Sequence, residues 1–392
     1  SYKKVKISDI GKIVSGATPK TKDVDNYGGS IAWITPADLS GYTSKYISHG
    51  SRNITQKGYD SCSTHLMPRG TVLFSSRAPI GYVAIAENPI CTNQGFKSIV
   101  PNDDIDSEFL YYQLQYLRKK IQEKGSGTTF KEISGKVLGE TDIVVPSLEE
   151  QSRIVAHIEE LFSELDKAVD TLKTTKEQLE VYRQAVLKDA FSDFEKKDSI
   201  RNLTMVVTSG SRDWAKYYSN SGALFVRIGN LTHSGIDIDF RDIQHITPPD
   251  NAEGVRTRLQ PNDVLVSITA DLGSIGFVSE KVEEAYINQH IALVRFQNPV
   301  QGRFMAWYLR SEYGQKDLLK NKRGGGKLGL GLDDIRDTPV PIVSDLVAQK
   351  TVDEIEERLS VCDSIEKTVD ATLAQADAMR QSILKQSFEE KI

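Results

Sequence analysis

Two short glycine-rich loops carry the most suggestive chemistry in the sequence, because cationic side chains flank both. They are residues 124–131 (KGSGTTFK) and residues 322–327 (KRGGGK). Backbone N–H groups exposed between cations can bind phosphate oxygens of a nucleic acid. Each loop alone is equally compatible with a solvated, flexible connection. Their recurrence at matching places in the two halves of the chain favours DNA.

Further cations and amides stand in or beside regions that alternate between strand and turn residues. Single surface cations are common, but several together can bind the DNA backbone and position a reading module. The candidate DNA-binding residues are Lys20, Arg77, Asn93, Gln94, Lys97, Lys124, Thr128, Lys131, Arg212, Arg227, Arg256, Arg258, Asn288, Gln289, Lys322, Arg323 and Lys327.

No catalytic or nucleotide-binding pattern survives inspection. Residues 324–329 (GGGKLG) formally fit the dinucleotide fingerprint, but the segment before them, DLLKNKR, is not a strand. The phosphate-binding P-loop pattern fails at Asn321 and Leu328. The Asn/Asp-Pro-Pro-aromatic tetrapeptide of adenine methyltransferases is absent, and the six histidines lack zinc-ligand spacing. The sequence therefore predicts a non-catalytic chain without a metal or cofactor of its own.

Length and composition predict an ordinary soluble protein of two or three domains. The chain has 392 residues, of which 39% are hydrophobic and 26% are charged, so normal cores can form. Its three cysteines include no CxxC pair, which argues against a disulfide scaffold and indicates a reducing compartment. We find no membrane-spanning run and no signal peptide, and therefore expect a cytoplasmic location.

The chain is an internal duplication with a period near 195 residues. Ser15-Gly16 corresponds to Ser209-Gly210, and residues 80–83 (IGYV) correspond to residues 275–278 (IGFV). Asn-Gln follows in both halves, then an apolar helical stretch, a glycine-rich loop and Val-Pro. Matches in the same order and at a near-constant offset predict two copies of one unit, related by pseudo-twofold symmetry.

Acidic residues are concentrated in two segments. Residues 148–195 have a net charge of -6 and residues 346–392 of -4, whereas residues 1–147 have +4 and residues 196–345 have +1. The overall charge of -5 therefore does not exclude a nucleic acid as a partner of the two neutral to basic segments. We predict four segments with boundaries at 1–147, 148–195, 196–345 and 346–392.

Both acidic segments show the apolar spacing of long helices that pair with other helices. Steps of four and three residues define a seam in the first, and a looser seam continues in the second. Ser147 with Glu150 forms a predicted capping box, and Ser344 or Asp345 can cap the second helix. We expect the seams to face each other as an antiparallel coiled coil and to leave the outer faces for other proteins. The predicted seam residues are Ile158, Leu161, Leu165, Leu172, Leu179, Ile355, Leu359, Val369 and Ile383.

The two neutral to basic segments are rich in short strands. Runs at residues 72–75, 82–86 and 97–100 are separated by prolines, and runs at 264–268, 276–278 and 291–296 repeat them. Each segment thus predicts a twisted, mixed or barrel-like sheet followed by one helix. The fold class is α+β, with two such domains separated by two long helices.

The motifs resemble those of the specificity subunits of Type I restriction-modification systems. The resemblance is carried by residues 15–19 (SGATP), 34–39 (ITPADL), 80–81 (IG) and 93–95 (NQG). Residues 145–155 (VPSLEEQSRIV), which lead into the first long helix, are the most specific of them. The second half departs from the pattern with SGSRDW at residues 209–214 and SDLVAQ at residues 344–349.

The resemblance implies a non-catalytic subunit with two target recognition domains and two conserved helical regions. Each recognition domain would read one half of an asymmetric, split target in double-stranded DNA, and the helices would set the spacing. Two methyltransferase subunits with S-adenosylmethionine, and restriction subunits with ATP and Mg, would be its partners. A coiled-coil assembly adaptor without sequence-specific DNA binding is the alternative. A cryptic nuclease or methyltransferase would need chemistry that the sequence lacks.

Overall fold

The computed structural model describes residues 3–127, 131–320, 322 and 329–390. The chain forms two compact units, which are described separately below. Unit 1 comprises Ser1–Leu172 with Ala371–Ile392, and unit 2 comprises Lys173–Asp370. Each unit therefore combines one predicted recognition domain with parts of both predicted helical regions.

The centre of unit 1 is a five-stranded mixed sheet in the order β2-β9-β6-β7-β5. The first four strands are antiparallel to their neighbours, and β5 pairs in parallel with β7. Among the described residues β2 and β5 remain separate edges, so the sheet is open and not a closed barrel. The elements are β1 (Lys3–Lys6), α1 (Ile7–Ile10), β2 (Gly11–Ser15), β3 (Tyr27–Ile31), β4 (Trp33–Ile34), β5 (Tyr46–Ile47), α2 (Gln56–Asp60), β6 (Val72–Phe74), β7 (Val83–Ala86), β8 (Cys91–Thr92), β9 (Lys97–Pro101), α3 (Ser107–Glu123), α4 (Gly135–Gly139) and β10 (Asp142–Val145).

Helix α3 covers one face of this sheet and forms the main core with it. Asp106 caps α3 by accepting hydrogen bonds from the backbone N–H groups of Glu108 at 2.8 Å and Phe109 at 2.9 Å. The buried side of α3 packs on β6 and β7, together with apolar residues from the long helices. The opposite face of the sheet packs on a second cluster that includes Ile34, Leu39 and Phe96.

Unit 2 repeats this architecture with two four-stranded sheets. One has the order β12-β19-β16-β17, which matches β2-β9-β6-β7 of unit 1, and the other has the order β13-β15-β14-β18. Two consecutive helices, α8 and α9, follow β19, where the sequence predicted one. The elements are β11 (Lys196–Ser199), α6 (Ile200–Leu203), β12 (Thr204–Ser209), β13 (Tyr218–Ser219), β14 (Ala223–Val226), β15 (Gln244–Ile246), α7 (Ala252–Thr257), β16 (Val264–Ser267), β17 (Ile275–Phe277), β18 (Ala285–Ile287), β19 (Ile291–Phe296), α8 (Gln301–Arg310), α9 (Glu312–Leu318), α10 (Leu332–Arg336) and β20 (Pro339–Pro341).

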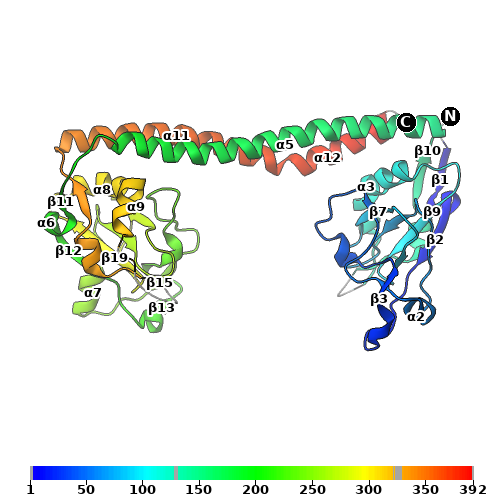
Figure 1. The fold of residues 1–392 in the computed structure, drawn as a ribbon, viewed down its shortest axis with the longest axis horizontal. Coiled ribbons are helices and arrows are strands. Elements are labelled where there is room, and N and C mark those ends of the chain that lie inside the picture. Colours follow the sequence, from blue (N-terminus) through cyan, green and yellow to red (C-terminus); the bar gives the residue numbers. More distant parts are fainter. Residues whose placement is uncertain (1–2, 128–130, 321, 323–328, 391–392) are drawn as a thin grey trace. The chain divides into compact units, whose positions relative to one another are not determined.

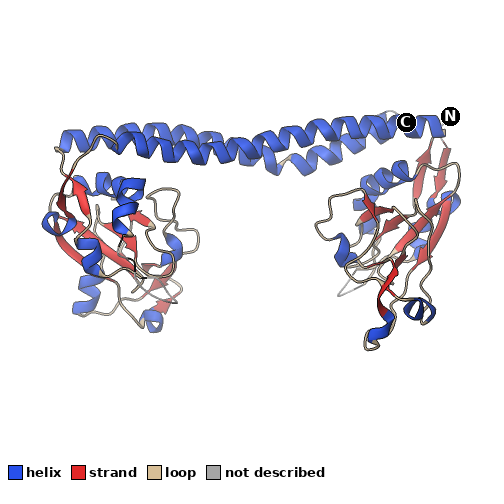
Figure 2. Cartoon of the chain, in the orientation of Figure 1, coloured by secondary structure: helices blue, strands red, loops and turns tan. Residues whose placement is uncertain are grey.

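The strands lie only in the recognition part of each unit, and the long helices extend beyond it (Figure 2). Helix α5 spans Leu148–Phe191, and the serine before it caps its start, because Ser147 Oγ accepts a hydrogen bond from Glu150 N at 3.4 Å. In unit 2, α5 and α11 (Asp345–Ala374) lie side by side (Figure 1). Lys176 pairs with Asp370 and Arg358 with Asp189, so the two helices are antiparallel.

The second helical segment is not continuous, in contrast to the sequence expectation. It consists of α11, α12 (Ala376–Lys385) and a π-helical turn at Gln386–Glu390, with a break at Gln375. No residue from 370 to 383, a stretch that the structure describes completely, is buried. Because no apolar side chain is buried there, core packing does not enforce a straight helix through this stretch.

The predicted seam residues divide into two groups by burial. The buried ones are Ile158, Leu165, Ile355, Leu359 and Val369, of which Ile158, Ile355 and Leu359 pack in the cores of the two units. Those that remain half-buried are Leu161, Leu172, Leu179 and Ile383. Of the helices in the described part of the chain, none is both long and apolar enough to cross a membrane.

Candidate nucleic-acid interface

Four loops that are distant in the sequence meet at one end of the sheet in unit 1. Ser76 N donates to Gly95 O at 2.8 Å, and Ile133 N donates to Ser76 O at 3.0 Å. Ala17 N donates to Thr92 O at 3.1 Å. We call residues 16–20, 75–82, 93–96 and 131–133 the loop junction of unit 1.

The same junction recurs in unit 2. Ser211 forms a bridge with Asn288, Ile268 N donates to His290 O at 2.9 Å, and Leu330 N donates to Ile268 O at 2.9 Å. Residues 210–213, 268–274, 288–290 and 329–330 form the loop junction of unit 2. The Ser-Gly and Asn-Gln motifs, about 80 residues apart in each half, are thus neighbours in both units.

The repeated glycine of the Ser-Gly motif is required by this close approach. A Cβ atom on Gly16 would lie 2.0 Å from Thr92 O, and one on Gly210 would lie 2.0 Å from Asn288 O. Neither distance is compatible with a side chain, because both contacts are with backbone atoms. The glycine therefore lets the first loop of each junction lie against the Asn-Gln turn.

Polar groups of unit 1 predicted from the sequence are gathered at its junction. The Gln94 side chain accepts a hydrogen bond from Thr18 Oγ1, and Arg77 lies 4.0 Å from the carboxylate of Glu132. Burial, with a contribution from Arg77 and opposed by Glu132, lowers the pKa of Lys97. A nearby phosphate would favour the charged form of this amine. Lys20 is exposed and Asn93 is half-buried in the same junction.

The junction of unit 2 and the segments that contact it carry different side chains. Arg256 NH1 donates to Thr208 Oγ1 at 2.5 Å and to Ser209 O at 2.6 Å, which fixes the guanidinium beside the first loop. The Gln289 amide lies 3.1 Å from the ring of His290. At the tip between β16 and β17, His233 Nε2 contacts an Asp271 carboxylate oxygen at 2.7 Å. Arg212 is exposed and Asn288 is buried in the same junction.

Several predicted residues lie away from the junctions or outside the described residues. Lys124 Nζ donates to Thr141 Oγ1 at 3.2 Å, and Arg227 pairs with Asp242. Arg258 is exposed and bridges to β18 through its backbone. Lys322 is exposed. Lys131, in contrast, is an exposed residue of the unit 1 junction and lines a cleft of about 510 Å³ between Ala78–Ile80 and α3. Thr128, Arg323 and Lys327 lie outside the described residues.

The junctions also contain residues that sequence reasoning missed. Thr18, Glu132 and His290 contact predicted residues there, and Arg52 lies on a neighbouring loop. In the sequence the histidines showed no recognisable spacing. Partners of His233 and His290 come from loops distant in the sequence, so no local pattern could reveal them. In the described part of the chain, no group of three or more His, Cys, Asp or Glu side chains could hold a metal ion.

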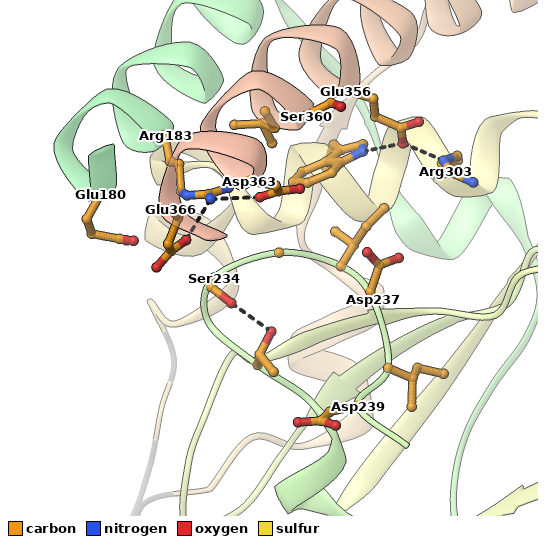
Figure 3. A pocket seen from close by; sticks show the side chains of 16 residues that line it. Glu180, Arg183, Ser234, Asp237, Asp239, Arg303, Glu356, Ser360, Asp363 and Glu366 are labelled. Carbon is orange, nitrogen blue, oxygen red and sulfur yellow. Dashed lines mark hydrogen bonds and ion pairs between the residues drawn. The ribbon is translucent and has the colours of Figure 1, made fainter. Parts of the chain in front are cut away.

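Charged side chains also join the long helices of unit 2 to its recognition domain. Arg183 of α5 pairs with Asp363 at 2.7 Å and with Glu366 at 2.9 Å, both on α11 (Figure 3). Glu356 of α11 accepts a hydrogen bond from Arg303 Nε of α8 at 2.5 Å. These residues border a cleft of about 480 Å³ between α11 and the loop of residues 232–239.

Unit 1 contains the equivalent contacts. Arg380 of α12 pairs with Asp166 of α5, and Glu159 of α5 pairs with Lys45 of the recognition domain. This equivalence exposes a repeat that the sequence analysis did not find, between residues 183–191 (RQAVLKDAF) and residues 380–388 (RQSILKQSF). Its terminal phenylalanines pack alike, Phe191 on Phe304 and Phe388 on Phe109.

The comparisons with known proteins agree with this architecture. The sequence model of the Type I restriction modification DNA specificity domain matches residues 1–181. The Type I restriction enzyme MjaIX specificity subunit of Methanocaldococcus jannaschii is 45% identical over 192 residues, which are 48% of this chain and 44% of that protein. The Type I restriction enzyme EcoBI specificity subunit of Escherichia coli is 24% identical over 422 residues and covers 99% of this chain and 85% of that protein.

The first half of the chain thus matches the specificity domain of Type I restriction-modification systems, and nearly the whole chain is similar to their specificity subunits. Solved structures share its fold over the full length. A chain from a structure described as the basis of complex assembly and conformational transition of the type I R-M system has a TM-score of 0.74 and 16% identity, covering 100% of this chain and 98% of that one. The HsdS subunit from Thermoanaerobacter tengcongensis has a TM-score of 0.60 and 17% identity, covering 100% and 97%. The specificity-subunit fold predicted from the motifs is therefore confirmed.

Proposed function

We propose that each loop junction of this specificity subunit reads one half of a split DNA target. The observation that carries the proposal is the duplicated junction, in which a shared backbone arrangement presents different side chains. Unit 1 presents Arg77, Lys97 and Gln94, whereas unit 2 presents Arg256, His233 and Asp271. Cations bind the DNA backbone, and amide, imidazole and carboxylate groups discriminate base edges.

The difference between the junctions makes the target asymmetric. A carboxylate such as that of Asp271 accepts hydrogen bonds from cytosine or adenine amino groups and is repelled by phosphates, whereas a guanidinium favours guanine. Two junctions with these different donors and acceptors would select different base sequences. The chain would not act chemically on either half-site, because it is the reading subunit of a larger complex.

The partners that we propose supply the chemistry. Two methyltransferase subunits would transfer methyl groups from S-adenosylmethionine to adenine N6, and restriction subunits would use ATP and Mg. The antiparallel helices would set the distance between the half-sites and dock the methyltransferases. The carboxylates of α5 and α11 are partly neutralised by cross-helix pairs such as Lys176 with Asp370 and Arg183 with Asp363.

We place part of the methyltransferase docking surface on a strip of exposed apolar side chains on the helices of unit 2. Val361 and Ile365, one turn apart on α11, are 57% and 41% exposed, and Tyr182 of α5 is 44% exposed. Arg358 joins the two helices at this place by donating from Nε to Tyr182 Oη at 3.3 Å. Apolar side chains that stay exposed on an otherwise charged helix pair are suited to burial against another protein.

Replacing Val361 with aspartate is expected to weaken methyltransferase binding by at least about tenfold, because a charge would be buried without a partner at the interface. Fold stability should change little, since this side chain is exposed in the chain itself. Titration of the purified methyltransferase by calorimetry measures the loss. Ser360→Asp, which adds the same charge at an exposed position on the side of α11 that faces the cleft, serves as the control. Equal affinities for V361D and the parent chain would contradict this docking surface.

Nuclease protection tests the reading function. The complex of the chain with its methyltransferase subunits is incubated with genomic fragments, unprotected DNA is digested, and the protected fragments are sequenced. We expect one shared pattern of two short specified blocks, with centres about 34–36 Å, one helical turn, or a multiple of it apart. Protected fragments without a shared sequence would instead support the alternative of an assembly adaptor that does not read DNA.

A further inference from the structure

We propose that Arg52 reads a guanine in the half-site recognised by unit 1; this inference rests on the proposed function. Arg52 was not among the residues predicted from the sequence, and nothing in its local sequence marks it. Its significance comes from how the surrounding fold holds the guanidinium.

The Arg52 guanidinium lies on the face of an anchored aromatic ring. Its central carbon is 3.6 Å from the centroid of the Tyr27 ring. Tyr27 is itself buried, and its hydroxyl donates to Pro19 O at 2.7 Å. A planar cation stacked on a fixed ring loses little further freedom on binding, so its hydrogen-bond donors are oriented in advance.

The donors of Arg52 are available for a ligand. Arg52 is exposed, and among the residues that the structure describes its guanidinium has neither a hydrogen-bond partner nor an ion-pair partner. Lys57, five residues further on, shows the contrast, because its amine pairs with Asp23 at 2.9 Å and Asp25 at 3.2 Å. Two neighbouring carboxylates thus neutralise the lysine and leave the arginine free.

The stacked ring connects Arg52 to the loop junction of unit 1. Pro19, which receives the Tyr27 hydrogen bond, follows Thr18, and Thr18 donates to Gln94. Trp33 Nε1 donates to Ala17 O at 3.0 Å and so fixes the same loop at a second point. Arg52 therefore lies beside the junction on a braced support. Two parallel donors in a fork match the O6 and N7 acceptors of guanine, which is the commonest specific arginine contact.

Unit 2 has no arginine at the position that corresponds to Arg52, as expected if the two units read different half-sites. Helix α2 begins after its cap Thr55 and helix α7 begins after its cap Asn251. Arg52 stands three residues before the first cap, whereas Pro248, which has no side-chain donor, stands three residues before the second. A guanine contact by Arg52 would thus belong to one half-site only.

Base-resolution methylation maps of cells that express the chain with its methyltransferase test the proposal. For Arg52→Ala and Arg52→Lys we expect one guanine of one half-site to become unspecified, with discrimination at that base reduced by about tenfold to a hundredfold. Lysine keeps the charge but not the planar fork, so R52K should relax the same base. The other half-site should stay unchanged, which also shows that each variant folds and assembles.

Arg69→Ala is the matched control and should leave the motif intact. Arg69 is also exposed, but it precedes β6 at the end opposite to the junction. An unchanged motif with uniformly weaker methylation in R52A would overturn the inference and indicate a phosphate contact. An unchanged motif at full methylation would overturn it as well. Absence of any bipartite motif with the parent chain would refute the proposed function itself.

Discussion

Replacing Arg295 with methionine should lower the stability of unit 2 by about 3–5 kcal/mol at neutral pH, because it leaves a buried carboxylate without its counter-ion. Arg295 on β19 binds Asp263 with two hydrogen bonds, Nε to Oδ1 at 2.8 Å and NH2 to Oδ2 at 2.7 Å. The Asp263 side chain is 0% exposed, and Gln260 N also donates to it at 2.7 Å. Methionine would fill the space but supply no donor.

The effect of this substitution should depend on pH. Burial raises the pKa of Asp263 above its usual value, and the Arg295 hydrogen bonds oppose that rise. Without Arg295 the pKa in the folded state rises further above the unfolded value of about 4. A group with a raised folded pKa stabilises the fold below the unfolded pKa and loses that contribution as pH rises through the folded pKa. The penalty of R295M should therefore be largest at pH 7 and shrink toward about pH 4.

Native-state hydrogen exchange of peptides covering β16 and β19 measures this stability in the full-length chain, since a chain of two units does not unfold in a single step. Arg241→Met is the matched control, because Arg241 is 91% exposed and pairs with Asp239 at the surface of the same unit. We expect R241M to leave exchange almost unchanged. Similar losses in both variants, or a penalty for R295M that grows at acid pH, would contradict the assigned role of the buried pair.

Features encoded in short stretches of sequence were predicted well. The apolar run of residues 72–75 becomes β6, and the run of residues 264–268 becomes β16, because every side chain of these strands is buried. Ser147 caps α5, although the Glu150 carboxylate pairs with Arg153 rather than completing a capping box. Local patterns sufficed here because the interactions lie within a few residues of each other.

Features that depend on packing between distant segments were not predicted. The break at Gln375 lies in a stretch where no residue is buried, and that stretch contains no proline or glycine. Lys124 resembled a phosphate ligand beside its glycines, but it turns to Thr141. Arg52 became a candidate only when Tyr27 and Pro19 were seen to brace it. The residues that determine these positions, such as Thr141 for Lys124 and Tyr27 for Arg52, are too distant in the sequence to form a recognisable local pattern.

The repeat at residues 183–191 and 380–388 shows a further limit of sequence reasoning. The helices were examined for seam periodicity, which treats each apolar position alike and ignores the polar residues between them. The structure gives those residues a role, because Arg183 and Arg380 both bind aspartates of the neighbouring helix. The duplication therefore includes the helical contacts as well as the recognition domains.

Domain exchange followed by base-resolution methylation mapping tests the central claim most directly. Residues 1–147 are replaced by the corresponding domain of a specificity subunit with a different target, and the chimaera is expressed with its methyltransferase. The account predicts that one half of the N6-methyladenine motif changes to that of the donor while the other half and the spacing remain. Exchange of residues 196–345 should change only the other half. A motif that survives both exchanges, or one in which both halves change together, would contradict the assignment of one half-site to each unit.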